Sequence, residues 1–493
     1  MSESTQSVTK LRPWPTPPAS KRLAPPATTA SGTTLLWRAA LPLSLITIAG
    51  VVSLLATDLD TSGRLIFFTF ATASTLWSIT RVDGAFVGLA SLAFLVVTGA
   101  APEQTLLHAL SSDVIWLLIG AFVIGRSLQV SGLAERFSRF CLGKARTVAG
   151  AFWMLSLALI PLAFFLPSTT GRAAILAPVY RTIAASFPSR RVARALALLV
   201  PVIVLTSSSS SLIAAASHLI VNDFLLERGV EPFSFGRWAL LGAPYGVASS
   251  LLACGVILWL LIGKKRRAQT FTMPATRPRP WSRQHFVVIA VVVAMVTLWL
   301  TPSLHGLGAS TVALLGAVLL CFPGVGCMTW AEGLRSISWS LLLFVGSALA
   351  VGRLLLSSGV AEWLVTGLLD ASPVGQNASE LLLVVSLAVV ALTSHLYVLS
   401  HATRAAVIIP PLFVLVASLG LDMRSVAFIV AMGTNYCLTF PVSSKALQLY
   451  QLERPNGLDA GDLMRIGALL LPIHLALITA FYFAYWKWMG LGI

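Results

Sequence analysis

One polar stretch occurs twice in this chain, as Ser168-Thr169-Thr170-Gly171-Arg172-Ala173-Ala174-Ile175-Leu176-Ala177-Pro178 and again as Ser400-His401-Ala402-Thr403-Arg404-Ala405-Ala406-Val407-Ile408-Ile409-Pro410. Each copy interrupts a long apolar segment, 147–186 in the first case and 381–418 in the second. Each segment is long enough for two passes across a bilayer. Irregular backbone at membrane depth is tolerated where it lines a cavity, so we interpret both segments as re-entrant hairpins.

The composition around these hairpins is that of a membrane protein. Of 493 residues, 57% are apolar and only 11% are charged, whereas soluble domains carry about 25% charged residues. We therefore expect an all-α integral membrane protein with an inverted-topology repeat, two re-entrant hairpins and about eleven transmembrane helices. The predicted helices cover 37–56, 65–80, 85–100, 113–130, 192–222, 238–262, 285–301, 308–323, 338–356, 424–443 and 466–486.

The distribution of positive charge supports this topology. The chain has 34 Lys and Arg against 18 Asp and Glu, for a net charge of +16. With a cytoplasmic N-terminus and an outside C-terminus, most basic residues fall in cytoplasmic segments, as the positive-inside rule requires. This explains the net charge without a nucleic-acid partner and favours a cell (inner or plasma) membrane. The five cysteines are scattered without ligand spacing, so no metal site is expected.

A second match shows that the repeat is longer than the hairpins. Gly125-Arg126 and the following Ser131-Gly132-Leu133-Ala134-Glu135 recur as Gly352-Arg353 and Ser358-Gly359-Val360-Ala361-Glu362. The first copy lies on a predicted inward-running span and the second on an outward-running one. Inverted repeats with segments broken at mid-membrane are typical of secondary transporters. We divide the chain into a disordered cytoplasmic tail (1–34), a first half (35–262), a basic cytoplasmic linker (263–284) and a second half (285–493).

Two further predicted spans are also broken by polar residues. The span 192–222 contains the run Ser207-Ser208-Ser209-Ser210-Ser211, and the span 424–443 contains Asn435 and ends near Ser443-Ser444-Lys445. Such breaks offer hydroxyls, freed carbonyls and half-helix N-termini, and the N-termini favour anions. Candidate cation-binding or supporting residues are Ser207, Ser208, Ser209, Ser210, Ser211 and Asn435.

Carboxylates are missing where these breaks meet. No Asp or Glu occurs from 147 to 222, and between 381 and 452 there is only Asp422, in a predicted outside loop. The charged groups are instead the intramembrane Arg172 and Arg404, which are functional candidates by default. They could bind an anion or pin hairpin carbonyls. The candidate substrate-binding residues are Ser168, Thr169, Thr170, Arg172, Ser400, His401, Thr403, Arg404, Ser443 and Ser444.

Several of these motifs resemble those of the divalent anion/sodium symporter family, within the wider ion transporter superfamily. The stretch 167–174 is similar to that family's Ser-Asn-Thr hairpin motif, and Trp116–Phe122, 235–244, Phe440–Ser443 and Tyr485–Leu491 are similar to further parts of it. The resemblance implies a homodimer in which a moving transport domain carries dicarboxylates, citrate or sulfate past a scaffold by an elevator mechanism.

This chain departs from the family pattern at the hairpin tips. The motif asparagine is replaced by Thr169 and His401, the motif threonine by Ala402, and the Pro-Pro-Asn of the broken-helix loops is absent. Arginine at position 172 resembles the sodium-independent dicarboxylate exchangers. We therefore favour exchange or proton coupling over sodium symport, with the coupling ion, sodium or proton, left open and no cofactor expected.

The favoured function is secondary transport of a small dicarboxylate across the lipid bilayer, without enzymatic activity or catalytic residues. One alternative is an inorganic oxyanion such as sulfate, and another is a cation/proton or metalloid antiporter of the same superfamily. A third is a membrane enzyme or sensor, for which only Ser443 with Lys445, or Ser400 with His395, could supply a nucleophile and base.

Overall fold

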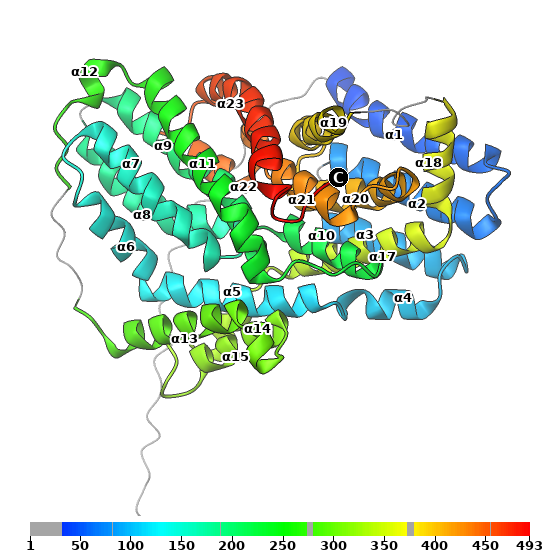
Figure 1. Ribbon diagram of the computed structural model, residues 1–493, viewed down its shortest axis with the longest axis horizontal. Helices are drawn as coiled ribbons and strands as arrows, with labels where there is room; N and C mark the ends of the chain where they lie inside the picture. Colours follow the sequence, from blue (N-terminus) through cyan, green and yellow to red (C-terminus); the bar gives the residue numbers. More distant parts are fainter. Residues whose placement is uncertain (1–31, 81, 188, 274–279, 372–378, 454) are drawn as a thin grey trace, which may run out of the picture.

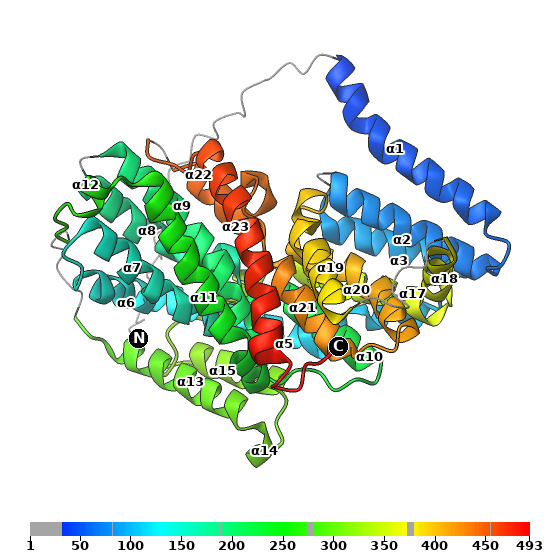
Figure 2. The same ribbon diagram turned by 45° about the horizontal axis from the view of Figure 1, so that its top comes forward.

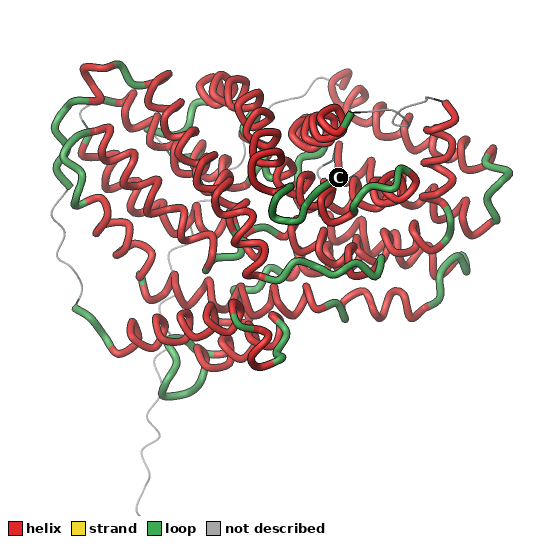
Figure 3. The backbone as a smooth tube through the Cα atoms, viewed as in Figure 1, coloured by secondary structure: helices red, strands yellow, loops and turns green. Residues whose placement is uncertain are grey.

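The structure is a computed structural model that describes residues 32–80, 82–187, 189–273, 280–371, 379–453 and 455–493. Within these residues every regular element is a helix, and the β interactions amount to one isolated bridge between Thr147 and Thr270 (Figure 3). The predicted all-α class is confirmed for this part of the chain.

Many of the helices are suited to a bilayer. In the described residues, seven are long and apolar enough to cross a membrane: Glu103–Ser131, Arg190–Ser210, Phe235–Leu261, Arg283–Leu300, Trp339–Ser357, His401–Ser418 and Ala460–Trp486. Shorter apolar helices cover Ala40–Leu55, Gly84–Val97, Val148–Phe164, Ala309–Cys321, Glu380–Leu396 and Met423–Thr434. The chain is therefore a multi-pass membrane protein. Each span expected from the sequence coincides with helical structure, while the exact number of crossings stays a prediction.

The first half of the chain begins with two helices and continues into the first hairpin and the first broken helix. Its elements are α2 (Thr61–Ile79), α3 (Gly84–Val97), α4 (Glu103–Leu107), η1 (His108–Leu110), α5 (Asp113–Ser131), α6 (Leu133–Leu142), α7 (Val148–Leu159), η2 (Ile160–Phe164), α8 (Thr169–Ser186), α9 (Arg190–Thr206), η3 (Ser207–Ser210), η4 (Leu212–Ala214), α10 (Ala216–Glu227) and α11 (Phe235–Leu261).

The second half repeats this order. Its elements are α13 (Arg283–Leu300), α14 (Pro302–His305), α15 (Ala309–Cys321), α16 (Trp330–Arg335), α17 (Trp339–Ser357), α18 (Val360–Ala371), α19 (Glu380–Thr393), η5 (Ser394–Leu396), α20 (His401–Ser418), α21 (Met423–Thr434), η6 (Pro441–Ser443), α22 (Lys445–Gln451), α23 (Ala460–Phe481) and the π-helix η7 (Tyr482–Trp486).

The helices of the two halves pack in matching pairs, as expected for a two-fold repeat. Helix α5 packs against α15, and its counterpart α17 packs against α3. The hairpin helix α8 packs against α22, and its counterpart α20 packs against α10. Figure 1 shows α5 lying along α13 and α15. These pairings are the ones that the predicted internal repeat requires, while the opposite sense of the halves relative to the membrane stays a prediction.

Two segments outside the repeat have more helix than the sequence suggested. Helix α1 (Gly32–Leu55) begins before the expected boundary at 35 and packs on α2, apart from the bulk of the molecule (Figure 2). The rest of the predicted tail, 1–31, lies outside the described residues. In the basic linker, α12 (Lys264–Arg267) forms a short helix, and the guanidinium Nε of Arg267 donates to the Ile262 carbonyl at 2.6 Å.

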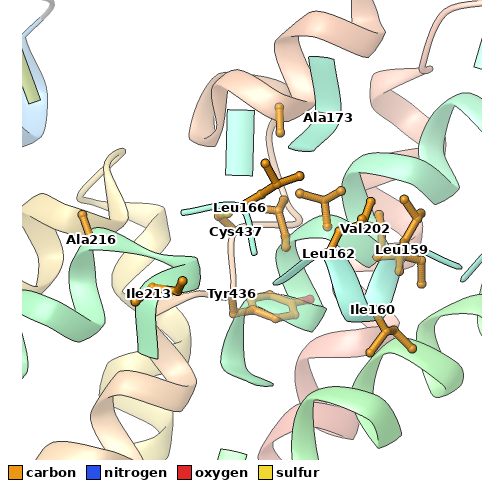
Figure 4. Close-up of a cluster of buried hydrophobic side chains, with 14 of the residues drawn as sticks. Leu159, Ile160, Leu162, Leu166, Ala173, Val202, Ile213, Ala216, Tyr436 and Cys437 are labelled. Atoms are coloured by element: carbon orange, nitrogen blue, oxygen red, sulfur yellow. The ribbon is translucent and has the colours of Figure 1, made fainter. Parts of the chain in front are cut away.

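The core lies between the hairpins and the broken helices. Beyond Arg190, Arg191 and Arg194, helix α9 is apolar, and 94% of the apolar window in its span is buried, whereas only 22% of the α13 window is. A helix that is hydrophobic all round belongs in a core, and α13 is left to face lipid. Figure 4 shows side chains of the first hairpin, among them Leu159 and Leu162, grouped with Val202 of α9. The apolar core thus packs against the first hairpin.

Candidate functional site

The first hairpin reverses its direction over residues 165–168. Pro167 cannot continue a helix because it lacks a backbone N–H. The hydroxyl of Ser168 then accepts a hydrogen bond from the Gly171 backbone N–H at 3.1 Å, so Ser168 caps α8. As a result, Thr169 and Thr170 occupy the first turn of α8, at the tip of the hairpin.

The second hairpin has the same local structure. Helix α19 ends in the turn η5, and the hydroxyl of Ser400 accepts from the Thr403 backbone N–H at 3.4 Å, which caps α20. His401 therefore opens α20 as Thr169 opens α8. His395 supports the hairpin from the side, since its Nε2 lies 2.6 Å from the Thr439 hydroxyl. The two polar stretches matched in sequence thus fold alike.

The two broken helices are also counterparts. In the first, Ser211 (φ −138°, ψ 140°) and Ala215 (φ −145°, ψ 139°) are extended residues on either side of the turn η4. In the second, Phe440 (φ −123°, ψ 140°) and Ser444 (φ −151°, ψ 135°) bracket η6 in the same way. Each break therefore ends with the N-terminus of a second half-helix, α10 or α22.

A cavity of about 940 Å³ lies where hairpins and broken helices meet. The first hairpin contributes Leu166, Pro167, Ser168, Thr169, Thr170, Gly171, Ala174 and Ile175, and the second contributes Leu399, Ser400, His401 and Ala402. The broken helices contribute Ala215, Ala216, Val442, Ser443, Ser444, Lys445 and Gln448. The remaining wall consists of Phe122, Gly125, Arg126, Gln129, Glu332, Arg335, Ser336, Ser338 and Leu341.

The electrostatics of this cavity favour an anion. The N-terminal ends of α8, α10, α20 and the short α22 all line it, and helix N-termini present free N–H groups and partial positive charge. Arg126, Arg335 and Lys445 add basic side chains. Among the described lining residues the one carboxylate is Glu332, and hydrogen bonds from the backbone N–H and hydroxyl of Thr329 hold its pKa below the ordinary value.

Arg172 lies behind the cavity wall rather than in it. Its side chain is fully buried, and its Nη2 donates to the Ser208 hydroxyl at 2.8 Å and to the Ala214 carbonyl at 3.1 Å. These contacts connect the first hairpin to the turn η3 before the first break and to η4 within it. In the part of the chain that the structure describes, the Nε of Arg172 has no hydrogen-bond partner.

Arg404 holds the corresponding position in the second half. Its Nη1 donates to the main-chain carbonyls of Thr434 and Tyr436, the latter at 2.9 Å, and its Nε donates to Val398 at 2.9 Å. The interpretation that the arginines pin hairpin carbonyls describes Arg404, which donates to Val398, whereas the carbonyl that Arg172 contacts, Ala214, belongs to the broken helix. Thr403 is likewise buried and does not line the cavity.

The serine run packs tightly against α11. The Ser209 carbonyl and the Ser210 side chain approach Gly242 and Gly246 so closely that an added Cβ would lie 2.3 Å and 2.1 Å from them. Ser207 and Ser208 face Arg172. The serine run does not line the cavity. The sequence therefore identified the correct broken helix, but the hydroxyls of this run do not face the cavity.

Ser443 is the broken-helix serine best placed to meet a ligand. Its hydroxyl is buried, lines the cavity, and has no hydrogen-bond partner among the described residues. The sequence analysis did not single out Gln448 or Arg335, which also line the cavity. Gln448 could have been predicted, because it follows Lys445 by three residues on a helix and so lies on the same helix face.

Two further arginines, matched between the two halves of the repeat, lie in different surroundings. Arg126 lines the cavity, with its Nη1 donating to Gln129 Oε1 at 2.8 Å. Arg353 instead forms ion pairs with Asp223 at 2.9 Å and Glu227 at 2.8 Å, and so connects α17 to α10. In the described residues no group of three or more His, Cys, Asp and Glu side chains could hold a metal ion.

Comparison with known proteins identifies relatives of this chain. The family model described as citrate transporter matches residues 74–433. A membrane protein of Cupriavidus necator is 24% identical over 398 residues, which are 78% of this chain and 76% of that protein. The citrate/succinate antiporter of Escherichia coli is 24% identical over 401 residues, 76% of this chain and 78% of the relative.

Two further likenesses extend the comparison. The chloroplast dicarboxylate transporter 2 of Spinacia oleracea is 25% identical over 298 residues, 57% of this chain, and the match covers only 51% of that relative's length. The crystal structure of the Alcanivorax borkumensis YdaH transporter superposes with a TM-score of 0.55 at 13% identity, covering 94% of this chain and 99% of that one. That superposition concerns the fold alone.

Proposed function

Because this chain belongs to the citrate transporter family, we propose that it is a secondary active transporter of small divalent anions, with dicarboxylates as the substrate class. The resemblance to divalent anion transporters noted in the sequence is in line with this membership. The main support for this proposal is that four helix N-termini converge on one cavity. The described residues that line this cavity include three basic side chains and a single carboxylate.

The dicarboxylate binds, in this proposal, between the two hairpin tips. Each carboxylate accepts hydrogen bonds from backbone N–H groups of a first turn, at Ser168–Thr170 or Ser400–Ala402, and from the nearby Ser443 hydroxyl. A cavity of about 940 Å³ leaves room for a dicarboxylate with its water. A cationic substrate is disfavoured because its charge would face the positive ends of the helices.

Arg172 and Arg404 act in this proposal mainly by position. Each holds the junction between a hairpin and a broken helix, so the helix ends stay aimed at the substrate. Their charge also favours the anion from behind the wall, because a buried guanidinium is poorly screened. They reach the substrate directly only if the junction opens during transport.

We further propose that transport proceeds by alternating access of the elevator type. The hairpins and broken helices move as one body past α5, α15, α17 and their neighbours. The Asp223–Arg353 ion pair bridges these two groups of helices and has to break on each passage. The protein is expected to be a homodimer in the cell membrane, with its N-terminus in the cytoplasm and its C-terminus outside.

Uptake of labelled succinate into liposomes that contain the purified protein tests the function. Three conditions are compared: an empty lumen, a lumen preloaded with unlabelled dicarboxylate, and an imposed sodium gradient. We expect uptake at least in the preloaded condition, and uptake with preloading alone would establish exchange. Folded protein that takes up succinate in none of the conditions would overturn the dicarboxylate proposal, and the same assay with labelled sulfate would then test the oxyanion alternative.

A further inference from the structure

Three segments of the chain form a basic surface at one edge of the molecule. They are α6 with the start of α7 (133–148), the start of α9 (187–194) and the end of α11 with α12 (261–273). Together they carry eleven Lys and Arg against one acid, Glu135, which pairs with Arg139 at 3.0 Å. The proposed substrate site uses none of these residues.

Hydrogen bonds bring the three segments together. The Phe271 N–H donates to the Arg146 carbonyl at 2.9 Å, beside the isolated β-bridge, and so joins the segment after α12 to the start of α7. The Nε of Arg191, at the start of α9, donates to the Leu261 carbonyl at the end of α11, also at 2.9 Å. Figures 1 and 2 show α12 at the edge of the molecule beside α7. Their charges therefore share one surface.

Most of the positive charge on this surface has no partner in the protein. Within the described residues, six exposed side chains make no hydrogen bond or ion pair: Arg146, Arg190, Arg194, Lys264, Lys265 and Arg266. At the matching chain ends of the second half, Arg424 pairs with Glu231 at 3.2 Å and Lys487 with Glu380 at 2.6 Å. The repeat therefore does not require unpaired charge, and like charges gathered in this way repel one another until an outside anion neutralises them.

Exposed aromatic side chains place the basic surface at the level of lipid headgroups. Trp259, in the last turns of α11, is 66% exposed, and its carbonyl accepts from the Nη2 of Arg267 at 3.0 Å. Phe140 of α6 is 64% exposed, and the Lys144 Nζ lies 4.6 Å from its ring centroid. Tryptophan is enriched where a membrane meets water, and basic residues combined with aromatic ones are typical of surfaces in the headgroup region. This favours a phospholipid over a soluble anion.

We propose that the basic surface binds the headgroups of anionic phospholipids and thereby holds the first hairpin and the first broken helix at one face of the membrane. The binding itself goes beyond the proposed function, and only its effect on transport rests on that function. In the predicted topology the surface faces the cytoplasm, where the leaflet carries the anionic lipids. Because α7 and α9 belong to the body that moves in the proposed elevator, bound headgroups oppose its outward passage.

Competition between two lipids tests the binding. Purified protein in detergent is mixed with equal amounts of phosphatidylglycerol and phosphatidylcholine with the same acyl chains, and native mass spectrometry counts the lipids retained. We expect a preference for phosphatidylglycerol, which Lys264→Gln combined with Lys265→Gln should reduce by roughly fivefold for each charge removed. Equal retention of the two lipids by the wild type, or an unchanged preference in this double variant, would overturn the proposal.

Two further double variants show whether position and charge matter. Arg283→Gln with Arg465→Gln removes two exposed charges on α13 and α23, on the same predicted side of the membrane, and should keep the preference. Lys264→Arg with Lys265→Arg keeps the charge and should also keep it. A loss in the first pair as large as in Lys264→Gln with Lys265→Gln would mean that net charge rather than this surface selects the lipid, and so would refute the assignment.

A soluble competitor distinguishes a lipid from a free phosphate. Glycerol 3-phosphate has the headgroup phosphate without acyl chains, so it should displace phosphatidylglycerol only weakly, because the exposed aromatic side chains contact the acyl region. Displacement at a concentration equal to that of the lipid would overturn the lipid proposal and assign a site for free phosphate.

Transport in defined vesicles tests the hold on the moving body. Succinate exchange is compared in phosphatidylcholine vesicles and in vesicles of which one quarter is phosphatidylglycerol. We expect slower exchange with phosphatidylglycerol, and a smaller difference in Lys264→Gln with Lys265→Gln. Equal rates for a wild type that retains phosphatidylglycerol would refute the hold. Protein that retains phosphatidylglycerol selectively but exchanges no dicarboxylate would support the lipid surface and overturn the proposed function instead.

Discussion

Arg172 donates a hydrogen bond of 2.8 Å to the hydroxyl of Ser208, and this bond joins the tip of the first hairpin to the first broken helix. The same guanidinium reaches the Ala214 carbonyl within the break at 3.1 Å. One side chain therefore sets the position of two helix N-termini that line the cavity. Arg404 repeats the arrangement in the second half, where its donors reach main-chain carbonyls.

Replacement of Arg172 should disable transport. In Arg172→Ala the Ala214 carbonyl loses a buried donor, at a cost of about 1–3 kcal/mol, and Arg172→Lys should also fail because an ammonium cannot reproduce the guanidinium fork. Arg404→Ala should behave likewise. Succinate exchange per amount of purified protein measures the effect. Arg126 lines the cavity, and Arg126→Ala is expected to lose far less exchange activity. Equal activity in all of these variants would contradict the positioning role.

Ser168 both caps α8 and lines the cavity, and two substitutions can separate these roles. Ser168→Ala removes the acceptor for Gly171 N–H and should destabilise the protein by about 1 kcal/mol, with weaker succinate binding. Ser168→Asn keeps a cap and should restore the thermal midpoint. Thermal unfolding and KM are measured for both variants. A midpoint that fails to recover in Ser168→Asn would show that capping is not the reason for the loss.

Glycine at position 246 is required by the packing of the serine run. A Cβ there would lie 2.1 Å from the Ser210 hydroxyl oxygen, so Gly246→Val should cost at least about 1–3 kcal/mol through overpacking and displace the break. Gly255→Val on the same helix is the control, because its Cβ would meet only Trp153 at an ordinary 3.7 Å. The thermal midpoints of the two purified variants are compared. Equal midpoints would contradict the close approach of Ser210 to Gly246.

The ion pair between Arg353 and Asp223 should show strong coupling. Arg353→Gln leaves the Asp223 carboxylate, which is 6% exposed, with the Ser112 hydroxyl at 2.8 Å. We expect a loss of about 1–3 kcal/mol, less than for a fully buried pair because Arg353 keeps contact with solvent. Adding Asp223→Asn should recover much of it. Additive losses in the double variant would mean that the two side chains do not interact.

Much of this architecture can be predicted from the sequence because it depends on local properties. The length of an apolar run sets whether it can cross a bilayer, and the matched stretches at 168–178 and 400–410 reveal the repeat without coordinates. The caps at Ser168 and Ser400 are local too, since a hydroxyl and an N–H three residues later suffice. The sequence therefore predicted the class, the repeat and the hairpin tips.

Only the tertiary structure decided which polar side chains face the cavity. Arg172 and Arg404 are intramembrane cations in the sequence, but their donors are directed at carbonyls and hydroxyls brought near by folding. The contact of His218 with Asn435, from the opposite half, is equally invisible in the linear chain. The physical reason is that a buried donor must find an acceptor, and the fold alone determines which distant backbone supplies it.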